Sequence, residues 1–128
     1  MRLLLDTHIA LWALTDDARL SARARALIED PANQVAVSAA SVWEIAIKHG
    51  LGRGDMPVSG GAALNWFRQA GYDLLPVTPD HAAAVEALPD HHCDPFDRLL
   101  IAQATSEPMR LITRDPLVAL YGGAVIQV

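Results

Sequence analysis

The sequence contains little cysteine, few aromatic residues and no excess of positive charge. Cys93 is the one cysteine among 128 residues, so the chain cannot form an internal disulfide, and we expect a reducing, cytoplasmic location. The formal net charge of −5 has the wrong sign for a protein that grips nucleic acid through a broad basic surface. The scattered Trp12, Trp43 and Trp66 are interpreted as core or interface residues rather than as platforms for stacked bases. Any role with nucleic acid must therefore depend on a local site or on a basic partner.

Long apolar segments are also missing. No stretch approaches the roughly 18 uninterrupted apolar residues of a membrane span, and the N-terminal run from Leu3 to Leu5 ends too soon for a secretory signal. We therefore expect neither export nor membrane insertion. With 52% hydrophobic and 20% charged residues, the chain can bury a core, and its length favours a single domain spanning residues 1–128.

Short apolar runs alternate with amphipathic segments, a pattern that is typical of βαβ units around a parallel sheet. The predicted strands are 3–5, 35–37, 72–77, 111–113 and 125–128. The predicted helices are 8–14, 22–29, 39–49, 62–70, 79–88, 95–106 and 116–121, with Gly50 expected to terminate the third of them. The sequence thus predicts an α/β fold, a three-layer α/β/α sandwich with a parallel five-stranded sheet.

Two acidic residues directly follow predicted strands. Asp6 ends the first strand, and Asp115 follows the fourth. The carboxyl ends of parallel strands lie at one edge of the sheet, which is where ligands bind in open α/β folds. Either side chain could instead serve only as the N-cap of the helix that follows.

Three further acidic residues lie on predicted helices. Glu44 is surrounded by apolar neighbours, and it could be either a site residue or a solvated surface partner of Lys48 one turn away. Asp94 is a good N-cap for the helix that begins at 95, and Asp97 in its first turn can project from the mouth of that helix toward the sheet edge.

Four carboxylates at one edge require a counter-charge. At ~4 Å and an effective dielectric near 20, each pair of carboxylates costs roughly 4 kcal/mol. Oxygen ligands select hard cations, so the expected ion is Mg²⁺ or Mn²⁺, which activates water and offsets the charge of a phosphodiester. Lys48, Arg53, Arg98 and Arg114 are the basic residues nearest this site in the sequence and could attract phosphate locally.

These acidic residues lie in four sequence blocks that resemble a known family. The blocks are Leu-Leu-Asp-Thr-His at 4–8, Ser-Ala-Ala-Ser-Val-Trp-Glu-Ile-Ala-Ile-Lys at 38–48, Asp-Pro-Phe-Asp-Arg-Leu-Leu-Ile-Ala-Gln-Ala at 94–104 and Leu-Ile-Thr-Arg-Asp at 111–115. Together, in this order and spacing, they resemble a PIN-domain protein, and more narrowly the VapC-type ribonuclease toxins of bacterial type II toxin–antitoxin systems. The resemblance covers nearly the whole chain.

The resemblance implies a metal-dependent endoribonuclease that is inhibited by a cognate antitoxin. Its RNA products would carry a 5′-phosphate and a 3′-hydroxyl. The metal-binding and catalytic acids of the family fall on Asp6, Glu44, Asp97 and Asp115. The supporting positions are Thr7, Ser41, Thr113 and Asp94, the last belonging to an Asp-Pro-Phe-Asp variant of the third block. We also expect a homodimer.

Three other functions are considered for this sequence, and two of them need residues that it lacks. A catalytically silent PIN-like module would bind RNA or protein without cutting. A receiver-type phosphoacceptor domain would need an acidic pair directly after a strand, which the sequence lacks. A zinc site at His91, His92 and Cys93 would need a second pair of ligands at a suitable spacing, and none is present.

Overall fold

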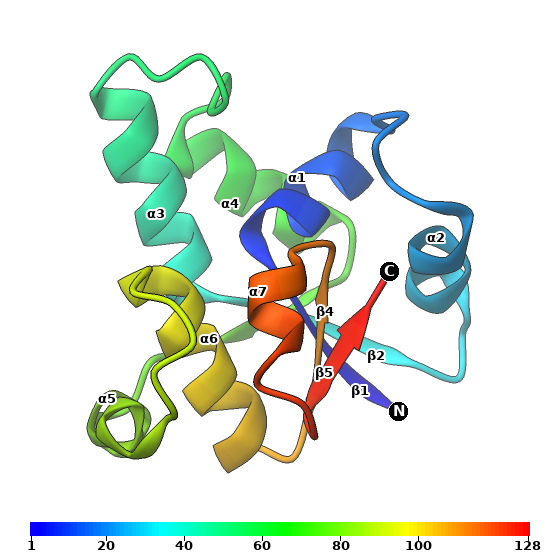
Figure 1. Cartoon of the computed structure of the whole chain (residues 1–128). Helices are drawn as coiled ribbons and strands as arrows, with labels where there is room; N and C mark the ends of the chain where they lie inside the picture. Colours follow the sequence, from blue (N-terminus) through cyan, green and yellow to red (C-terminus); the bar gives the residue numbers. More distant parts are fainter.

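A computed structural model describes all residues, 1–128, as a parallel five-stranded sheet between helices (Figure 1). The strands are β1 (Arg2–Leu5), β2 (Gln34–Ser38), β3 (Asp73–Leu75), β4 (Arg110–Thr113) and β5 (Val125–Gln127). Their order across the sheet is β3-β2-β1-β4-β5, with Leu5 of β1 paired with Ile112 of β4. The predicted parallel sheet is therefore confirmed, and β1 and β4 are neighbours at its centre.

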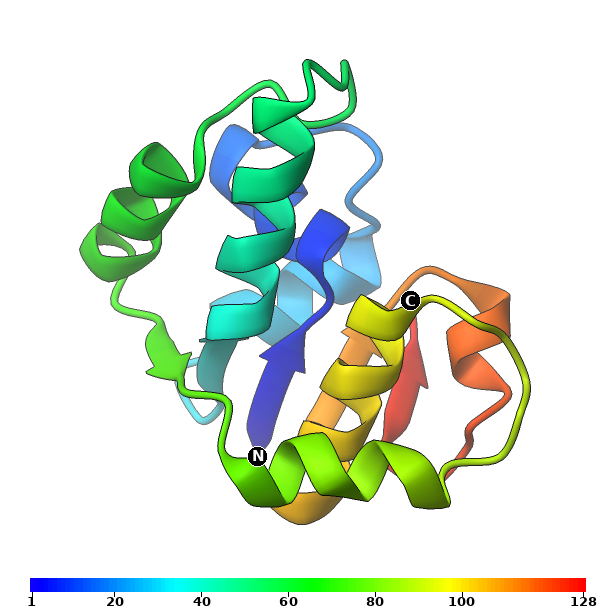
Figure 2. The same cartoon turned by 90° about the vertical axis from the view of Figure 1, so that its left-hand side faces the viewer.

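Eight helical segments connect and cover the strands (Figure 2). They are α1 (Thr7–Thr15), α2 (Ala22–Glu29), α3 (Ala39–Gly50), α4 (Gly60–Gln69), α5 (Pro79–Ala84), the 3₁₀ helix η1 (Val85–Ala87), α6 (Pro95–Ser106) and α7 (Pro116–Ala119). None of them combines the length and the apolar character that crossing a bilayer requires.

Alternating side chains of β1 divide the core into two layers. Leu3 and Leu5 pack on one face of the sheet with residues of α1, α2 and α4. Leu4 points the opposite way and packs with residues of α6 and α7. This alternation is the period of two that a strand imposes on its side chains. The α/β/α arrangement predicted from the sequence follows from it.

The predicted helix ends need three corrections. Gly50 is the last residue of α3 rather than its terminator, and the first glycine after α3 with a positive φ is Gly52, at +71°. The helix expected at 62–70 begins at Gly60, because the Ser59 side chain accepts a hydrogen bond from the backbone of Ala62. The segment expected as one helix over 79–88 is α5 followed by η1.

Gly60 also sets how closely α3 and α4 approach each other. A Cβ atom at this position would lie 2.8 Å from the Cβ of Ala46 on α3. Only a residue without a side chain allows this contact.

The three tryptophans differ in how far they are buried. Trp12 is half-buried against the core. Trp43 and Trp66 are 58% and 41% exposed, so they are not core residues, and for these two the interface interpretation stays a prediction. Their positions place them on the outward faces of α3 and α4, and the apolar periodicity of a helix does not by itself distinguish such a face from a buried one.

Candidate active site

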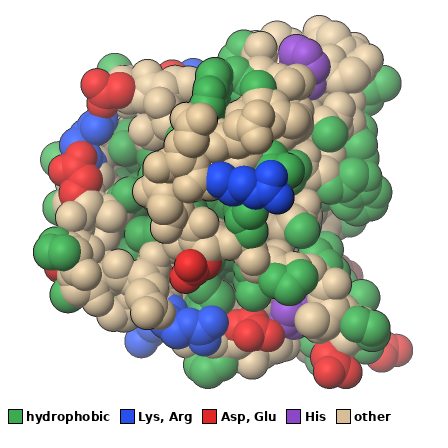
Figure 3. All heavy atoms as spheres, turned by 180° about the vertical axis from the view of Figure 1, so that it is seen from behind, with side chains coloured by type: hydrophobic (Ala, Val, Ile, Leu, Met, Phe, Trp, Pro, Cys, Tyr) green, Lys and Arg blue, Asp and Glu red, His purple; other side chains and the backbone are tan.

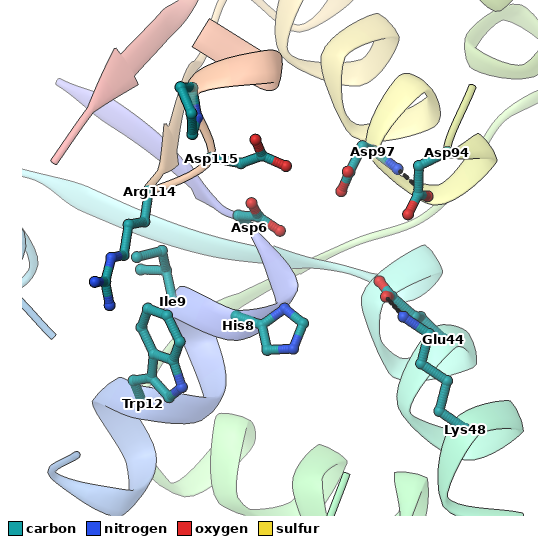
Figure 4. A pocket seen from close by; sticks show the side chains of 11 residues that line it. Asp6, His8, Ile9, Trp12, Glu44, Lys48, Asp94, Asp97, Arg114 and Asp115 are labelled. Atoms are coloured by element: carbon teal, nitrogen blue, oxygen red, sulfur yellow. Dashed lines mark hydrogen bonds and ion pairs between the residues drawn. The ribbon is translucent and has the colours of Figure 1, made fainter. Parts of the chain in front are cut away.

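A pocket opens at the carboxyl ends of β1 and β4 (Figure 4). The helix after β1 packs on one face of the sheet and the helix after β4 on the other, so the chain leaves a crevice between these strands. Eleven residues line the pocket: Asp6, His8, Ile9, Trp12, Glu44, Lys48, Asp94, Asp97, Arg114, Asp115 and Pro116. Five of them are acidic, and they come from four separate segments of the chain.

Asp6 lies between β1 and α1 and lines the pocket. It is 8% exposed, and its side chain makes no capping hydrogen bond to α1, so the alternative role as a helix cap is excluded. Its Oδ2 instead accepts a hydrogen bond from the Thr113 hydroxyl at 2.6 Å. Burial raises the pKa of Asp6 above its ordinary value, and the hydrogen bond from Thr113 partly opposes that shift.

Asp115 combines both roles considered for it. Its Oδ1 accepts a hydrogen bond from the backbone N–H of Leu117 at 2.8 Å, which caps α7. Its own N–H donates to the hydroxyl oxygen of Thr113 at 3.1 Å. Since that hydroxyl donates to Asp6, Thr113 joins the ends of the two strands and holds both acidic residues at the pocket.

Asp94 and Asp97 enter the pocket from the start of α6. Asp94 caps this helix by accepting hydrogen bonds from the backbone N–H groups of Phe96 and Asp97, at 2.9 and 3.2 Å. Burial and, after it, the negative charges of Asp6, Asp94, Glu44 and Asp115 together raise the pKa of Asp97 to about 8. The raised pKa of Asp97 therefore reflects its burial among four other carboxylates.

Glu44 is buried, with 3% of its surface exposed, which excludes the solvated surface pair considered from the sequence. Its Oε1 accepts a hydrogen bond from the Thr7 hydroxyl at 2.7 Å, and its Oε2 lies 2.5 Å from Nζ of Lys48. The Thr7 hydroxyl also lies 2.9 Å from that of Ser41. Thr7 and Ser41 thus lie beside the Glu44 carboxylate, and their role in supporting a metal stays a prediction.

Arg98 does not reach the pocket, contrary to expectation. Its guanidinium donates to the carbonyl oxygens of Pro89 and Val85, at 2.9 and 3.3 Å, and to the Tyr121 hydroxyl at 2.8 Å. Adjacent residues on an α-helix are rotated by about 100° from each other. When Asp97 faces the pocket, Arg98 consequently faces the loop before α6. Arg53, also outside the pocket, pairs with Asp55 at 3.3 Å.

Trp12 and His8 also line the pocket. From the sequence, Trp12 is interpreted as a core or interface residue, and His8 is the first residue of a predicted helix. The guanidinium of Arg114 lies 5.6 Å from the centre of the Trp12 ring, a cation–π contact at the rim of the pocket. The signal in the sequence was their spacing: residues 8 and 12 are one helical turn apart, on the face of α1 that begins beside Asp6.

The donor set fits a hydrated, hard divalent cation. No three acidic, histidine or cysteine side chains converge closely enough to enclose an ion in this conformation. Mg²⁺ does not require such a cage, because it retains several waters and binds proteins through one or two carboxylates. Five carboxylates around one pocket, with the pKa of Asp97 raised to about 8, match that mode of binding.

Comparison with known proteins agrees with this geometry. Residues 3–121 match the PIN domain family. The chain is 36% identical over 115 residues to Ribonuclease VapC22 of Mycobacterium tuberculosis, covering 88% of this chain and 85% of that protein.

Solved structures share the fold. VapBC2 from Rickettsia felis, bound to a DNA fragment from its promoter, aligns with a TM-score of 0.72 at 14% identity, covering 99% of this chain and 98% of that one. A toxin–antitoxin complex from Klebsiella pneumoniae aligns with a TM-score of 0.66 at 19% identity, covering 98% and 96%. On the sequence match and the shared architecture, the chain belongs to the PIN domain family.

Proposed function

We propose that residues 1–128 form a single PIN domain that hydrolyses RNA phosphodiester bonds internally, uses Mg²⁺ or Mn²⁺, and is inhibited by a cognate antitoxin. The observation that carries this proposal is the acidic pocket at the ends of β1 and β4, in which burial and four neighbouring carboxylates raise the pKa of Asp97 to about 8. The similarity to a protein named as a VapC ribonuclease supports RNA as the substrate.

In this proposal Asp6, Glu44, Asp97 and Asp115 hold the metal, directly or through waters. When bound, the ion supplies a water of lowered pKa and offsets the charge of the phosphodiester. Thr113 fixes Asp6, and Thr7 fixes Glu44, so two of the four carboxylates are oriented before substrate arrives. The capping bonds of Asp94 place the first turn of α6, and with it Asp97, at the rim of the pocket.

The phosphates of RNA are attracted by local cations rather than by a basic surface. On the face shown in Figure 3, acidic and basic side chains are interspersed and form no basic patch. At the pocket, Arg114 lies on one side of the acidic cluster and Lys48 on the other (Figure 4). A strand whose scissile phosphate lies over the carboxylates can place its flanking phosphates near these two cations.

The direct test is incubation of the purified protein with a mixed RNA pool, with Mg²⁺ and with EDTA. We expect internal cleavage that requires the metal and is lost in Asp6→Asn, whose side chain keeps the hydrogen bond from Thr113 but loses the charge. Cleavage that persists in EDTA and in Asp6→Asn would identify a contaminating nuclease. RNA that is bound but not cut by the wild-type protein would favour a non-catalytic binding module instead.

We also propose that an antitoxin with a basic or amphipathic segment binds near the pocket and blocks it. The net charge of −5, the acidic pocket and the exposed Trp43 on α3 support a partner of this chemistry. The structural neighbours include a toxin–antitoxin complex.

Co-expression with the product of the adjacent small gene should give a complex that no longer cuts RNA. Absence of such a gene product, or a complex that remains fully active, would favour a free-standing nuclease.

Light scattering on the free protein tests the homodimer expected from the sequence.

A further inference from the structure

A row of hydrogen bonds connects Asp97 to three residues that do not line the pocket. Nη1 of Arg98 lies 2.8 Å from the Tyr121 hydroxyl, and that hydroxyl lies 2.9 Å from Nδ1 of His92. Nε2 of His92 lies 3.3 Å from Oδ2 of Asp97. Three segments meet here: the loop before α6, the first turn of α6 and the residues after α7.

The chemistry of these groups sets the direction of each bond. The guanidinium of Arg98 can only donate, so the Tyr121 oxygen accepts from it. Tyr121 has a single hydroxyl proton, and Nδ1 of His92 is closer to it than the carbonyl oxygen of His92, at 2.9 against 3.5 Å. With Nδ1 accepting, the ring proton is on Nε2, where it is donated to Asp97.

The surroundings keep this row in place. The His92 side chain is 9% exposed, and its ring makes a T-shaped contact with the Tyr121 ring, with 5.3 Å between the ring centres. Arg98 also donates to the carbonyl oxygens of Pro89 and Val85, which ties the loop that carries His92 to α6. The imidazole is therefore held by contacts on the loop, on α6 and on Tyr121.

We propose that His92 is a positioning residue for Asp97, with Tyr121 and Arg98 fixing its tautomer. His92 occupies Oδ2 of Asp97 and orients the carboxylate, while Oδ1 accepts no hydrogen bond and is the oxygen available to a ligand. Groups behind a ligating carboxylate commonly change metal affinity or activity by about 10- to 100-fold. This inference rests on the proposed metal-dependent nuclease and assigns His92 a role that neither the sequence motifs nor the pocket lining indicated.

Four variants test the inference by Mn²⁺ calorimetry without RNA and by steady-state RNA cleavage. His92→Asn keeps a polar group near Tyr121 but cannot reach Asp97, and we expect its Kd for Mn²⁺ to rise about 10-fold or more and its kcat to fall with little change in KM. His92→Gln can place its amide nitrogen where Nε2 lies and should retain most of the Mn²⁺ affinity and of kcat. Tyr121→Phe does not touch Asp97, and its Mn²⁺ affinity and kcat should lie between those of His92→Asn and His92→Gln.

His91→Gln is the matched control, because His91 packs on the same Tyr121 ring but makes no hydrogen bond to Asp97. Equal thermal unfolding of His92→Asn and His92→Gln would separate positioning from loss of structure. Imidazole ¹⁵N spectra of the Mg²⁺-loaded wild-type protein should show the proton of His92 on Nε2.

Three outcomes would overturn the inference. A proton on Nδ1 would contradict the direction of the bonds, and wild-type affinity and kcat in His92→Asn would exclude the positioning role. If the wild-type protein neither binds Mn²⁺ nor cuts RNA, the proposed function fails together with the inference. If the wild-type protein binds Mn²⁺ and cuts RNA, and the His92 variants do so equally well, the inference is rejected and the proposed function is kept.

Discussion

Glu44→Gln is expected to give a folded protein that still binds RNA and cuts it slower by orders of magnitude. The substitution is nearly isosteric, and the remaining amide oxygen can accept the hydrogen bond that Thr7 now donates to Oε1. What disappears is one negative charge, and with it a carboxylate able to hold the metal or to orient the attacking water. Electrostatic groups at a reacting centre commonly contribute about 10²- to 10³-fold each to kcat.

The fold should tolerate the change, although not without cost. In Glu44→Gln, Lys48 loses the carboxylate that lies 2.5 Å away, but its side chain lines the pocket and is 16% exposed, so its ammonium group keeps access to water. RNA binding should be kept or become tighter, because one negative charge leaves the pocket. Circular dichroism, RNA binding in EDTA and single-turnover cleavage measure the three effects.

Glu86→Gln is the matched control, since Glu86 is exposed on η1, outside the pocket. It should behave as wild type in all three measurements. If Glu44 were only a helix-surface partner of Lys48, the pair would be worth about 0.3 to 0.5 kcal/mol and cleavage would be intact. Wild-type cleavage by a folded Glu44→Gln protein would reject the four-carboxylate mechanism.

Asp97→Asn is expected to abolish most of the stabilisation that Mg²⁺ or Mn²⁺ gives to the wild-type protein. A ligand at ~100 times its Kd adds about 2.7 kcal/mol to the free energy of unfolding, so the metal should raise the Tm of the wild-type protein clearly. The asparagine side chain removes a charged ligand at the rim of the pocket. Calorimetry of both proteins with and without metal measures the difference, and an unchanged metal response in Asp97→Asn would exclude Asp97 from the site.

Asp97→Asn should also change how the stability of the metal-free protein depends on pH. The pKa of Asp97 is raised from 3.8 to about 8 in the folded state, so folding favours the protonated carboxyl. The contribution of Asp97 to the free energy of unfolding is complete below about pH 4 and is lost as the pH rises through 8. The Tm of the metal-free wild-type protein should therefore fall more steeply between pH 5 and 8.5 than that of Asp97→Asn, and equal slopes would contradict the raised pKa.

Much of the fold can be predicted from the sequence, because its signals are local. Leu3, Leu4 and Leu5 form an apolar run that is typical of a buried strand, and the Asp94-Pro95 pair marks the start of α6. The errors lie at the ends of helices and of the third strand, which is expected over 72–77 and is observed at Asp73–Leu75. Ser59 begins α4 two residues earlier than expected, and the glycine that follows it is required by the contact with Ala46 on α3, which the local sequence does not indicate.

The candidate site divides in a similar way. Asp6 and Asp115 could be placed together from the sequence, because parallel strands put their carboxyl ends at one edge and this depends only on topology. Whether either acid merely caps a helix could not be decided. The answer depends on Thr113, which is 107 residues from Asp6 and reaches its carboxylate only when β4 pairs with β1.

The sequence by itself determined the α/β class, the order of strands and helices along the chain, and the common sheet edge at which Asp6 and Asp115 lie. These depend on apolar periodicity and on the geometry of parallel strands, which neighbouring residues encode. Only the tertiary structure decided that Glu44 is buried, that Arg98 turns away from the pocket and that His92 faces Asp97. The partner of a side chain is chosen by packing between distant segments, where burial removes water as the competing partner.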